Sequence, residues 1–335
     1  MHEYLKTRLY DKIGIFSDNH VWMKMPDGCE VGGGGLFATT EDNLRLMKLY
    51  ADGGVWEGER ILAADFVERA TTLQNESTSE ESKNPPAKDN FVGYGYQIWM
   101  CRPKGVYRAD GAMGQFTIVV PDMDMIIAIT ENAAGAHWAQ STLDTMWEFI
   151  DRIKAHAGQD FEEDGQAAER LAMRMRRLAL PSPVYAPYSP VIPQIKGRVW
   201  RVKEGSLYMG DVGMAHHMAG MELPDCVLAF SFGFCCDSVT MKWETKKGDA
   251  QAVIATDGSR RWNVLEGGAV VQGLMSGAWT EENVLEVRTR FVETCRERVM
   301  TFTFEGERVL VKEKVNMAFG EPTEQVIQAE LSKEE

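Results

Sequence analysis

The sequence predicts an α+β protein in two parts: an antiparallel sheet with covering helices, followed by an antiparallel β-barrel or sandwich. Two apolar runs, 115–120 and 125–130, are nearly continuous, which is typical of strands covered on both faces. Residues 137–155 form an amphipathic helical pattern that could cover one of those faces. From Gly197 onward many short segments alternate apolar and polar residues with period two, which predicts strands.

Composition and net charge limit the classes of protein to which this chain can belong. The 335 residues are 44% hydrophobic and carry a net charge of −14, which is typical of a globular chain of about two domains. An acidic chain is a poor partner for nucleic acid, which needs clustered Lys and Arg. No run approaches the roughly 20 apolar residues of a membrane span, and no signal peptide begins the chain. We therefore expect a cytoplasmic protein with six reduced, mostly buried cysteines.

The first part opens with short helices. Tyr4 to Leu9 carries an apolar helical stripe that Gly14 could end. Thr39 and Asp42 have the spacing of a capping box, which predicts a helix that runs to Asp52. A second short helix fits 63–71, and the polar stretch 74–90 is expected to be an exposed loop.

Strands follow. The segments 94–100, 106–109, 115–120 and 125–130 are predicted as strands, with the helix over 137–155 after them. An acidic stretch, a basic helical segment and five prolines then occupy 158–195. We therefore divide the chain into residues 1–157, a linker over 158–195, and a β-rich domain over 196–330.

Few residues carry obvious chemistry. The glycines 32–35 lack the Lys-Ser/Thr of a phosphate loop, so a tight turn before a helix is favoured. No spacing suits zinc, and no cofactor motif is present, so neither a metal nor a cofactor is expected. The tryptophans of the second part could line a barrel that binds an apolar ligand, although core packing is the more common role; they are Trp200, Trp243, Trp262 and Trp279.

Residues 1–151 also contain an ordered set of motifs. The stretch 33–42 reads Gly-Gly-Gly-Leu-Phe-Ala-Thr-Thr-Glu-Asp, and 93–99 reads Gly-Tyr-Gly-Tyr-Gln-Ile-Trp. Asp110-Gly111-Ala112-Met113-Gly114-Gln115 follows, and 120–122 reads Val-Pro-Asp. In this order the motifs resemble the C-terminal half of the β-lactamase-like serine hydrolases, which include class C β-lactamases, DD-peptidases and related esterases.

The resemblance implies amide or ester hydrolysis through an acyl-serine. In that family the nucleophile belongs to Ser-x-x-Lys, and a Tyr-x-Asn motif assists proton transfer. Neither motif occurs in this chain, nor does a Gly-x-Ser-x-Gly elbow. We therefore assign no catalytic residue and expect the chain to be inactive by itself, so whether it is an enzyme stays open.

The family's third motif, on the strand that lines the pocket, falls at Ala109-Asp110-Gly111 by this alignment. Gly111 fits a strand that substrate approaches closely, whereas Ala109 supplies no basic residue. Arg108 could provide the charge if the strand register differs, and Asp110 is either a site carboxylate or a turn residue. With Gln115, which could bind substrate or stabilise the turn, these form the candidate substrate-binding set: Arg108, Asp110, Gly111 and Gln115.

A second hypothesis is that the chain has no catalytic role. It is then a binding or scaffold protein whose β domain holds a ligand or a partner. An incomplete hydrolase domain should expose a sheet edge, whereas a self-contained protein should hide its edges. The partners expected under the first hypothesis are a small-molecule or peptide substrate and an N-terminal half or an oligomer that covers such an edge.

Overall fold

The computed structural model places the chain in two compact units, residues Met1–Ala155 and His156–Glu335. We describe each unit by itself. The structure describes residues 1–15, 21–76, 81, 83, 85–133, 139–156, 158–159, 164–181, 183, 186–213, 223–265, 272–316 and 324–332. His137, which the sequence places in a helix, lies outside these residues.

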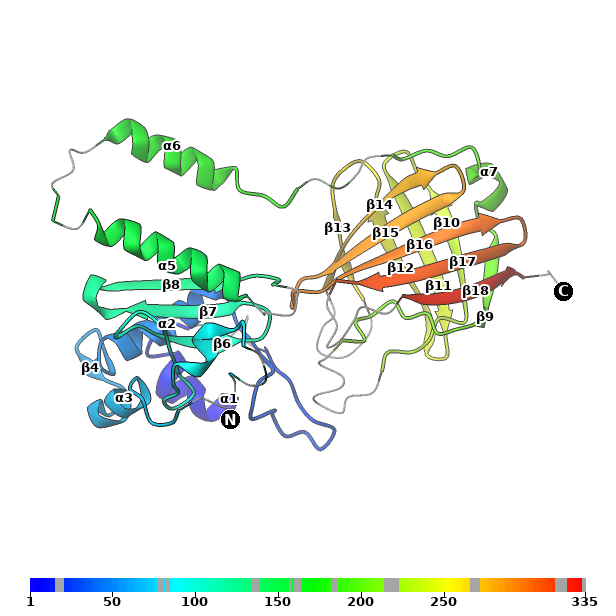
Figure 1. Cartoon of the computed structure of the whole chain (residues 1–335). Helices are drawn as coiled ribbons and strands as arrows, with labels where there is room; N and C mark the ends of the chain where they lie inside the picture. The colour runs from blue at the N-terminus through cyan, green and yellow to red at the C-terminus, as the bar shows by residue number, and fades with distance from the viewer. Residues whose placement is uncertain are drawn as a thin grey trace. The chain divides into compact units, whose positions relative to one another are not determined.

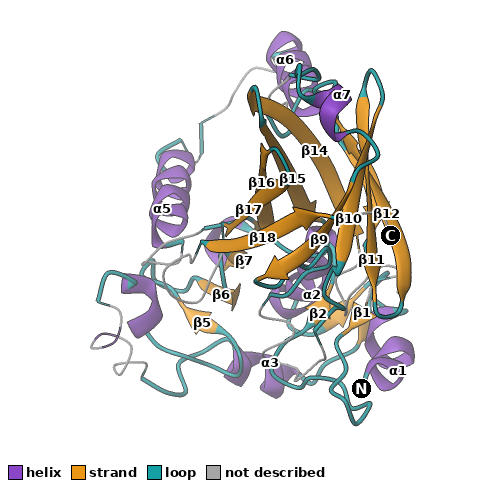
Figure 2. Cartoon of the chain, turned by 90° about the vertical axis from the view of Figure 1, so that its right-hand side faces the viewer, coloured by secondary structure: helices purple, strands orange, loops and turns teal. Residues whose placement is uncertain are grey.

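Unit 1 is built on a four-stranded antiparallel sheet of order β5-β6-β7-β8 (β6 to β8 are labelled in Figure 1, and β5 in Figure 2). Its strands are β5 (Trp99–Met100), β6 (Tyr107–Gly111), β7 (Gln115–Val120) and β8 (Met125–Thr130). The strands predicted over 115–120 and 125–130 are confirmed; β7 buries Phe116 to Val120 on both faces, whereas the residues of β8 are half-buried or exposed. The expected strand over 94–100 is wrong for most of its length, since only Trp99 and Met100 pair with β6.

Helices cover both faces of this sheet. On one face α5 (Gln140–Lys154) inserts Leu143, Trp147 and Ile150 against Phe116 and Ile118 of β7. On the other face α2 (Thr40–Ala51) packs Met47 against a cluster from the sheet. Strand β7 is therefore enclosed, and Ile118 is fully buried. The sequence prediction of a helix that covers the sheet is confirmed.

The predicted capping box of α2 is confirmed. The backbone N–H of Asp42 donates to the Thr39 side chain, and the backbone N–H of Thr39 donates to the Asp42 carboxylate. The same N-terminal half contains α1 (His2–Leu5), η1 (Lys6–Tyr10), β1 (Val21–Trp22), β2 (Leu36–Phe37), β3 (Val55–Trp56), β4 (Glu59–Arg60) and α3 (Ala64–Ala70).

The polar stretch 74–90 is not wholly an exposed loop. Its last residues form the 3-10 helix η3 (Lys88–Phe91), in which Asp89 is fully buried. The prediction is wrong at this end because the Asp89 carboxylate finds several donors inside unit 1, described below. Composition alone shows only a polar stretch without apolar periodicity.

Unit 2 is an antiparallel β-barrel. Nine strands form the ring, in the order β12-β11-β10-β9-β18-β17-β16-β15-β14, and β14 returns to β12 (Figure 2). The structure therefore decides for a barrel over a sandwich. The strands are β9 (Val199–Glu204), β10 (Ala229–Phe234), β11 (Ser238–Thr245), β12 (Gly248–Ala255), β13 (Arg261–Val264), β14 (Gln272–Glu281), β15 (Val284–Phe291), β16 (Glu297–Glu305), β17 (Arg308–Val315) and β18 (Gln325–Leu331).

One side chain replaces backbone pairing at the seam of the ring. Strands β12 and β14 share a single parallel pair, Ala255 with Ser276, and among the described strands β13 pairs only with β14. The Asn263 side chain on β13 accepts from the Val253 backbone N–H at 2.8 Å and donates to the Val253 carbonyl at 2.9 Å. Its amide thus makes the two hydrogen bonds that a neighbouring strand would make.

Aromatic side chains fill the interior. Trp200 stacks on Phe230 with ring centroids 6.1 Å apart, and Phe232 meets Phe302 edge to face at 5.1 Å. Trp200, Trp243 and Trp279 are buried, whereas Trp262 is 56% exposed. Three of the four tryptophans are therefore buried, and Trp200 and Trp279 pack against other aromatic rings.

Two strands of the barrel, β14 and β18, are not predicted by the sequence pattern. Strand β14 contains Gly273, Ser276 and Gly277, which have low β propensity. Strand β18 mixes apolar residues with Gln and Glu in a pattern that fits a short helix as well as a strand. Both form strands because the ring supplies partners on each side. Helices α6 (Gly165–Arg176) and α7 (Ile192–Ile195) fall within the range expected to be a linker.

All six cysteines are free of disulfides. Only Cys101 is buried, while Cys29, Cys235 and Cys236 are exposed, so the expectation of mostly buried thiols is wrong. Among the helices that the structure describes, none is long and apolar enough to cross a membrane.

Candidate functional site

The four sequence-predicted residues lie together on the β6–β7 hairpin. Gly111 and Gln115 are opposite each other in the register, and the Gln115 side-chain amide donates to the Ala112 carbonyl at 2.9 Å. A Cβ on Gly111 would lie 3.0 Å from the Gln115 side chain, which is a tight contact. Gln115 therefore closes the turn from within the hairpin.

The tip of the hairpin is held from outside as well. Gly114 has φ +90°, and a Cβ there would lie 2.4 Å from the Glu131 side chain, so only glycine fits without strain. The Met113 carbonyl accepts from the Ala133 backbone N–H at 2.9 Å. Glu131 in turn accepts from the Thr142 hydroxyl at 2.6 Å, which connects the tip to the first turn of α5.

Arg108 is fully buried on the face of the sheet that α5 covers. Its Nη2 lies 2.8 Å from the Asp110 carboxylate and donates to the Asn90 side chain at 2.8 Å. Its Nη1 donates to the carbonyls of Met100 and Asp89 at 3.3 and 3.4 Å. These contacts neutralise the charge inside unit 1.

Asp110 combines a shielded carboxyl with an accessible backbone. Its side chain is 20% exposed, although the residue as a whole is exposed. Burial raises the pKa of the Asp110 carboxyl, and the attraction of Arg108 opposes this shift. Burial also raises the pKa of the nearby Tyr94 phenol, and the negative charge of Asp110 adds to that shift.

The end of β6 has a free edge. Among the described residues, β5 pairs with β6 only at Tyr107 and Arg108, so Ala109, Asp110 and Gly111 extend past it. Apart from the ladder to β7, no backbone hydrogen bond joins these three residues to another segment that the structure describes. The main-chain donors and acceptors on that side can therefore meet an extended ligand, and Gly111 adds no side chain to obstruct it.

Behind this hairpin lies a buried carboxylate that the sequence does not reveal. Asp89 accepts from the Arg102 backbone N–H and Nε, both at 2.9 Å, from Gln140 at 2.8 Å and from the Trp147 indole at 3.1 Å. Burial by itself raises the pKa of this carboxyl, but the donated hydrogen bonds outweigh it and the pKa lies below its usual value. The cluster fixes η3, and with it the Asn90 side chain and the Asp89 carbonyl that accept hydrogen bonds from Arg108.

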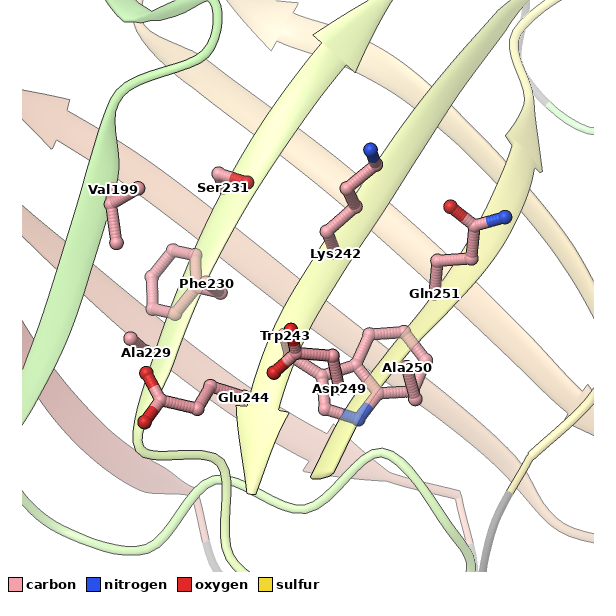
Figure 3. A pocket seen from close by; sticks show the side chains of 10 residues that line it. All are labelled: Val199, Ala229, Phe230, Ser231, Lys242, Trp243, Glu244, Asp249, Ala250 and Gln251. Atoms are coloured by element: carbon pink, nitrogen blue, oxygen red, sulfur yellow. The ribbon is translucent and has the colours of Figure 1, made fainter. Parts of the chain in front are cut away.

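The barrel carries a groove on its outer wall. A cavity of about 440 Å³ opens over β9 to β12 (Figure 3). Cross-strand pairing puts Ser231, Lys242 and Gln251 in one row and Ala229, Glu244 and Asp249 in the next. Because Phe230 and Trp243 occupy the alternate, inward positions, the side chains that line the groove are mainly those of the outer face. Polar and apolar residues contribute equally to the lining, which carries both signs of charge.

One end of the barrel interior is charged. Arg298 is buried and donates to three consecutive carbonyls, those of Tyr208, Met209 and Gly210, at 2.7, 2.6 and 3.0 Å. Beside it, Arg296 pairs with the buried Asp211. Burial lowers the pKa of the Arg298 guanidinium. These contacts fasten the segment 207–213 to the barrel. The guanidinium groups of Arg296 and Arg298 therefore have a structural role.

No cluster of three or more His, Cys, Asp or Glu able to hold a metal ion occurs among the described residues. The chain's similarity to known proteins is limited. No family model matches the chain, and no curated protein matches it.

Solved structures give weak similarities. The octameric penicillin-binding protein homologue from Pyrococcus abyssi is 13% identical, with a TM-score of 0.28; the match covers 98% of this chain and 60% of that one. The REP1-NXSQ fatty acid transporter is 14% identical with a TM-score of 0.30, over 41% of this chain and 96% of that chain. The Schistosoma mansoni fatty acid binding protein in complex with arachidonic acid is 13% identical, also with a TM-score of 0.30, over 41% and 95%. At TM-scores this low we base the function on the geometry of the site.

Proposed function

We propose that unit 1 is the substrate-binding wall of a β-lactamase-related serine hydrolase, and that this chain forms no acyl-enzyme by itself. The observation that carries the proposal is the free edge of β6 at Ala109–Gly111. It coincides with the position where the sequence resemblance puts the family's pocket-lining strand.

The edge suits an acyl substrate that binds in an extended conformation. A peptide or β-lactam amide can pair with main-chain N–H and C=O groups there, as an added strand would. The hairpin is rigidly braced by Gly114, Glu131 and Gln115, so the edge is preorganised. Arg108 supports this wall from inside through Asp110, and in this proposal it is a positioning residue.

Chemistry requires a nucleophile that the chain's motifs do not supply. An acyl-serine forms when an activated hydroxyl attacks the carbonyl, and activation needs a base within hydrogen-bond reach. The sequence contains neither Ser-x-x-Lys nor Tyr-x-Asn. We therefore expect substrate binding at β6 without covalent turnover.

Covalent labelling tests the second half of the proposal. The purified chain is incubated with a fluorophosphonate and, separately, with benzylpenicillin, and the intact mass is measured. The expected result is an unchanged mass. A stoichiometric adduct on a serine would show that the chain carries its own nucleophile and would overturn this half.

Binding at the edge is tested by NMR with an acylated D-Ala-D-Ala peptide. We expect chemical-shift changes at the amides of Ala109, Asp110 and Gly111, and loss of these changes with a peptide N-methylated at its amides. The methyl group removes the donor that strand pairing needs. No change at these amides, or equal binding of the methylated peptide, would contradict the proposed wall.

A second candidate function is non-catalytic binding by the barrel. The groove over β9 to β12 favours it, because it offers Lys242 beside Gln251 and Ser231 on a rigid wall. The partner would be a small polar ligand with an anionic group near Lys242. A screen of polar metabolite anions against wild type and Lys242→Ala by thermal shift would test it, since stabilisation must disappear in the variant.

A further inference from the structure

Strand β8 leaves the sheet of unit 1 with an unprotected edge. Its sequence, Met-Ile-Ile-Ala-Ile-Thr, contains no charge, proline or glycine, and every residue is at least partly exposed. It pairs with β7 on one side, and no backbone hydrogen bond joins its other side to a segment that the structure describes. Natural sheet edges are normally blocked by charges, bulges or covering loops. Strand β8 has no charge and no bulge, and no loop among the described residues is hydrogen-bonded to its free side.

The apolar surface continues from β8 onto α5. Met125, Ile127 and Ile129 share a cluster with Met146 of α5. The opposite flank of α5 carries Asp144, which binds Arg102 next to β5. Met146 therefore marks the β8 flank, and at 100° per residue Phe149 and Ile153 fall on the same flank. Phe149 is 47% exposed there, which is unusual for a large apolar side chain on a helix that otherwise buries its apolar face.

We propose that a second copy of this chain covers this surface, through antiparallel pairing of β8 with β8 about a two-fold axis. Such an axis, perpendicular to the sheet, leaves α5 of both copies on the same face. The two α5 flanks then approach each other across the axis. The inference does not depend on the proposed hydrolase function.

Register follows from the pleat. Residues opposite each other in an antiparallel pair point to the same face, and odd-numbered residues of β8 face α5 in both copies. Pairs must therefore join odd with odd and even with even. Placing Ile127 opposite Ile127 of the second copy satisfies this rule. Met125 of each copy then lies opposite Ile129 of the other, so that apolar residues pair on this face.

Two features favour a copy of this chain over another occupant. The strand is self-complementary and uncharged, so pairing places no like charges opposite each other despite the net charge of −14. The other end of the sheet is the two-residue strand β5, which is too short to extend the array. The contact is therefore isologous and closes at two copies rather than forming a fibre.

The full chain is tested by sedimentation velocity over a dilution series, together with amide exchange at 125–129. We expect a dimer that dissociates on dilution, and exchange of the β8 amides that slows as protein concentration rises. In the variant Phe149→Glu each copy carries a carboxylate at this position, and the two like charges face each other across the two-fold axis. We therefore expect the dimer dissociation constant to rise about tenfold or more. The matched control Val264→Glu, which changes a 74% exposed residue of the barrel, should leave it unchanged.

Each readout can overturn the proposal. A chain that stays monomeric at all concentrations refutes it. So does a dimer that Phe149→Glu leaves intact while β8 amides exchange at a concentration-independent rate, because the interface would then lie elsewhere. Should Phe149→Glu unfold the protein, the exchange data on the wild-type chain still decide the question.

Discussion

Replacing Asp89 by asparagine tests whether the buried carboxylate organises the face of the unit 1 sheet that α5 covers. Its Oδ1 accepts from the Arg102 backbone N–H, and its Oδ2 accepts from Arg102, Gln140 and Trp147. An asparagine oxygen can replace only one of these two atoms. Its NH₂ group must then face at least one donor, and Arg102 loses a buried counter-charge.

The expected cost follows from these contacts. Removing one partner of a buried ion pair costs about 3–5 kcal/mol of unfolding free energy. Asp144 still binds Arg102, whose side chain is 37% exposed, so we take the lower end, about 3 kcal/mol. The matched control is Asp144→Asn, which removes a 47% exposed carboxylate from the same arginine and should cost less than about 1 kcal/mol.

Amide exchange at Ile118 and Val119 measures this cost in unit 1 alone, because both residues lie in its core. For Asp89→Asn we expect exchange to accelerate about a hundredfold, since 1.4 kcal/mol corresponds to a factor of ten. An effect no larger than that of Asp144→Asn would refute the reasoning. It would mean that the carboxylate is replaceable and that packing of Trp147 alone fixes η3.

The remaining predictions concern pH, the hairpin tip, the barrel seam and a thiol. Because folding lowers the pKa of Asp89, its carboxylate stabilises the folded state fully above the unfolded pKa of about 4, and this stabilisation is lost as the pH falls through the pKa of the folded state. In acid titrations, the difference in unfolding free energy between wild type and Asp89→Asn should therefore shrink below pH about 4. Gly114→Ala should destabilise unit 1 in urea by more than Gly105→Ala, whose φ of +79° is also left-handed but whose Cβ meets nothing within 4 Å; equal effects would contradict the contact with Glu131. Asn263→Ala should raise amide exchange in β12, because the seam loses both side-chain hydrogen bonds, and unchanged exchange there would argue against the seam. Burial raises the pKa of Cys101 to about 11, so iodoacetamide at neutral pH should leave it unmodified in the folded chain while the exposed Cys29 is alkylated, as mass mapping would show.

The sequence alone determined the parts whose signal is local. The apolar runs of β7 and β8 specify strands because both faces must be covered, and Thr39 with Asp42 specifies a helix start through two short-range hydrogen bonds. The alternation in the second part predicts antiparallel strands, yet it fits a sandwich as well as a barrel. Closure depends on Ala255 reaching Ser276 and on the Asn263 amide, which join residues that no local pattern relates.

The candidate site divides in the same way. The motif order in the sequence located Arg108, Asp110, Gly111 and Gln115, and all four lie on one hairpin. Only the tertiary structure showed that Arg108 is buried and that no other described strand pairs with the outer side of β6 at Ala109–Gly111. Both depend on where β5 ends and on what η3 brings over the sheet. Asp89 was hidden for the same physical reason: a polar loop and a buried carboxylate look alike in sequence until the chain places Gln140 and Trp147 around the acid.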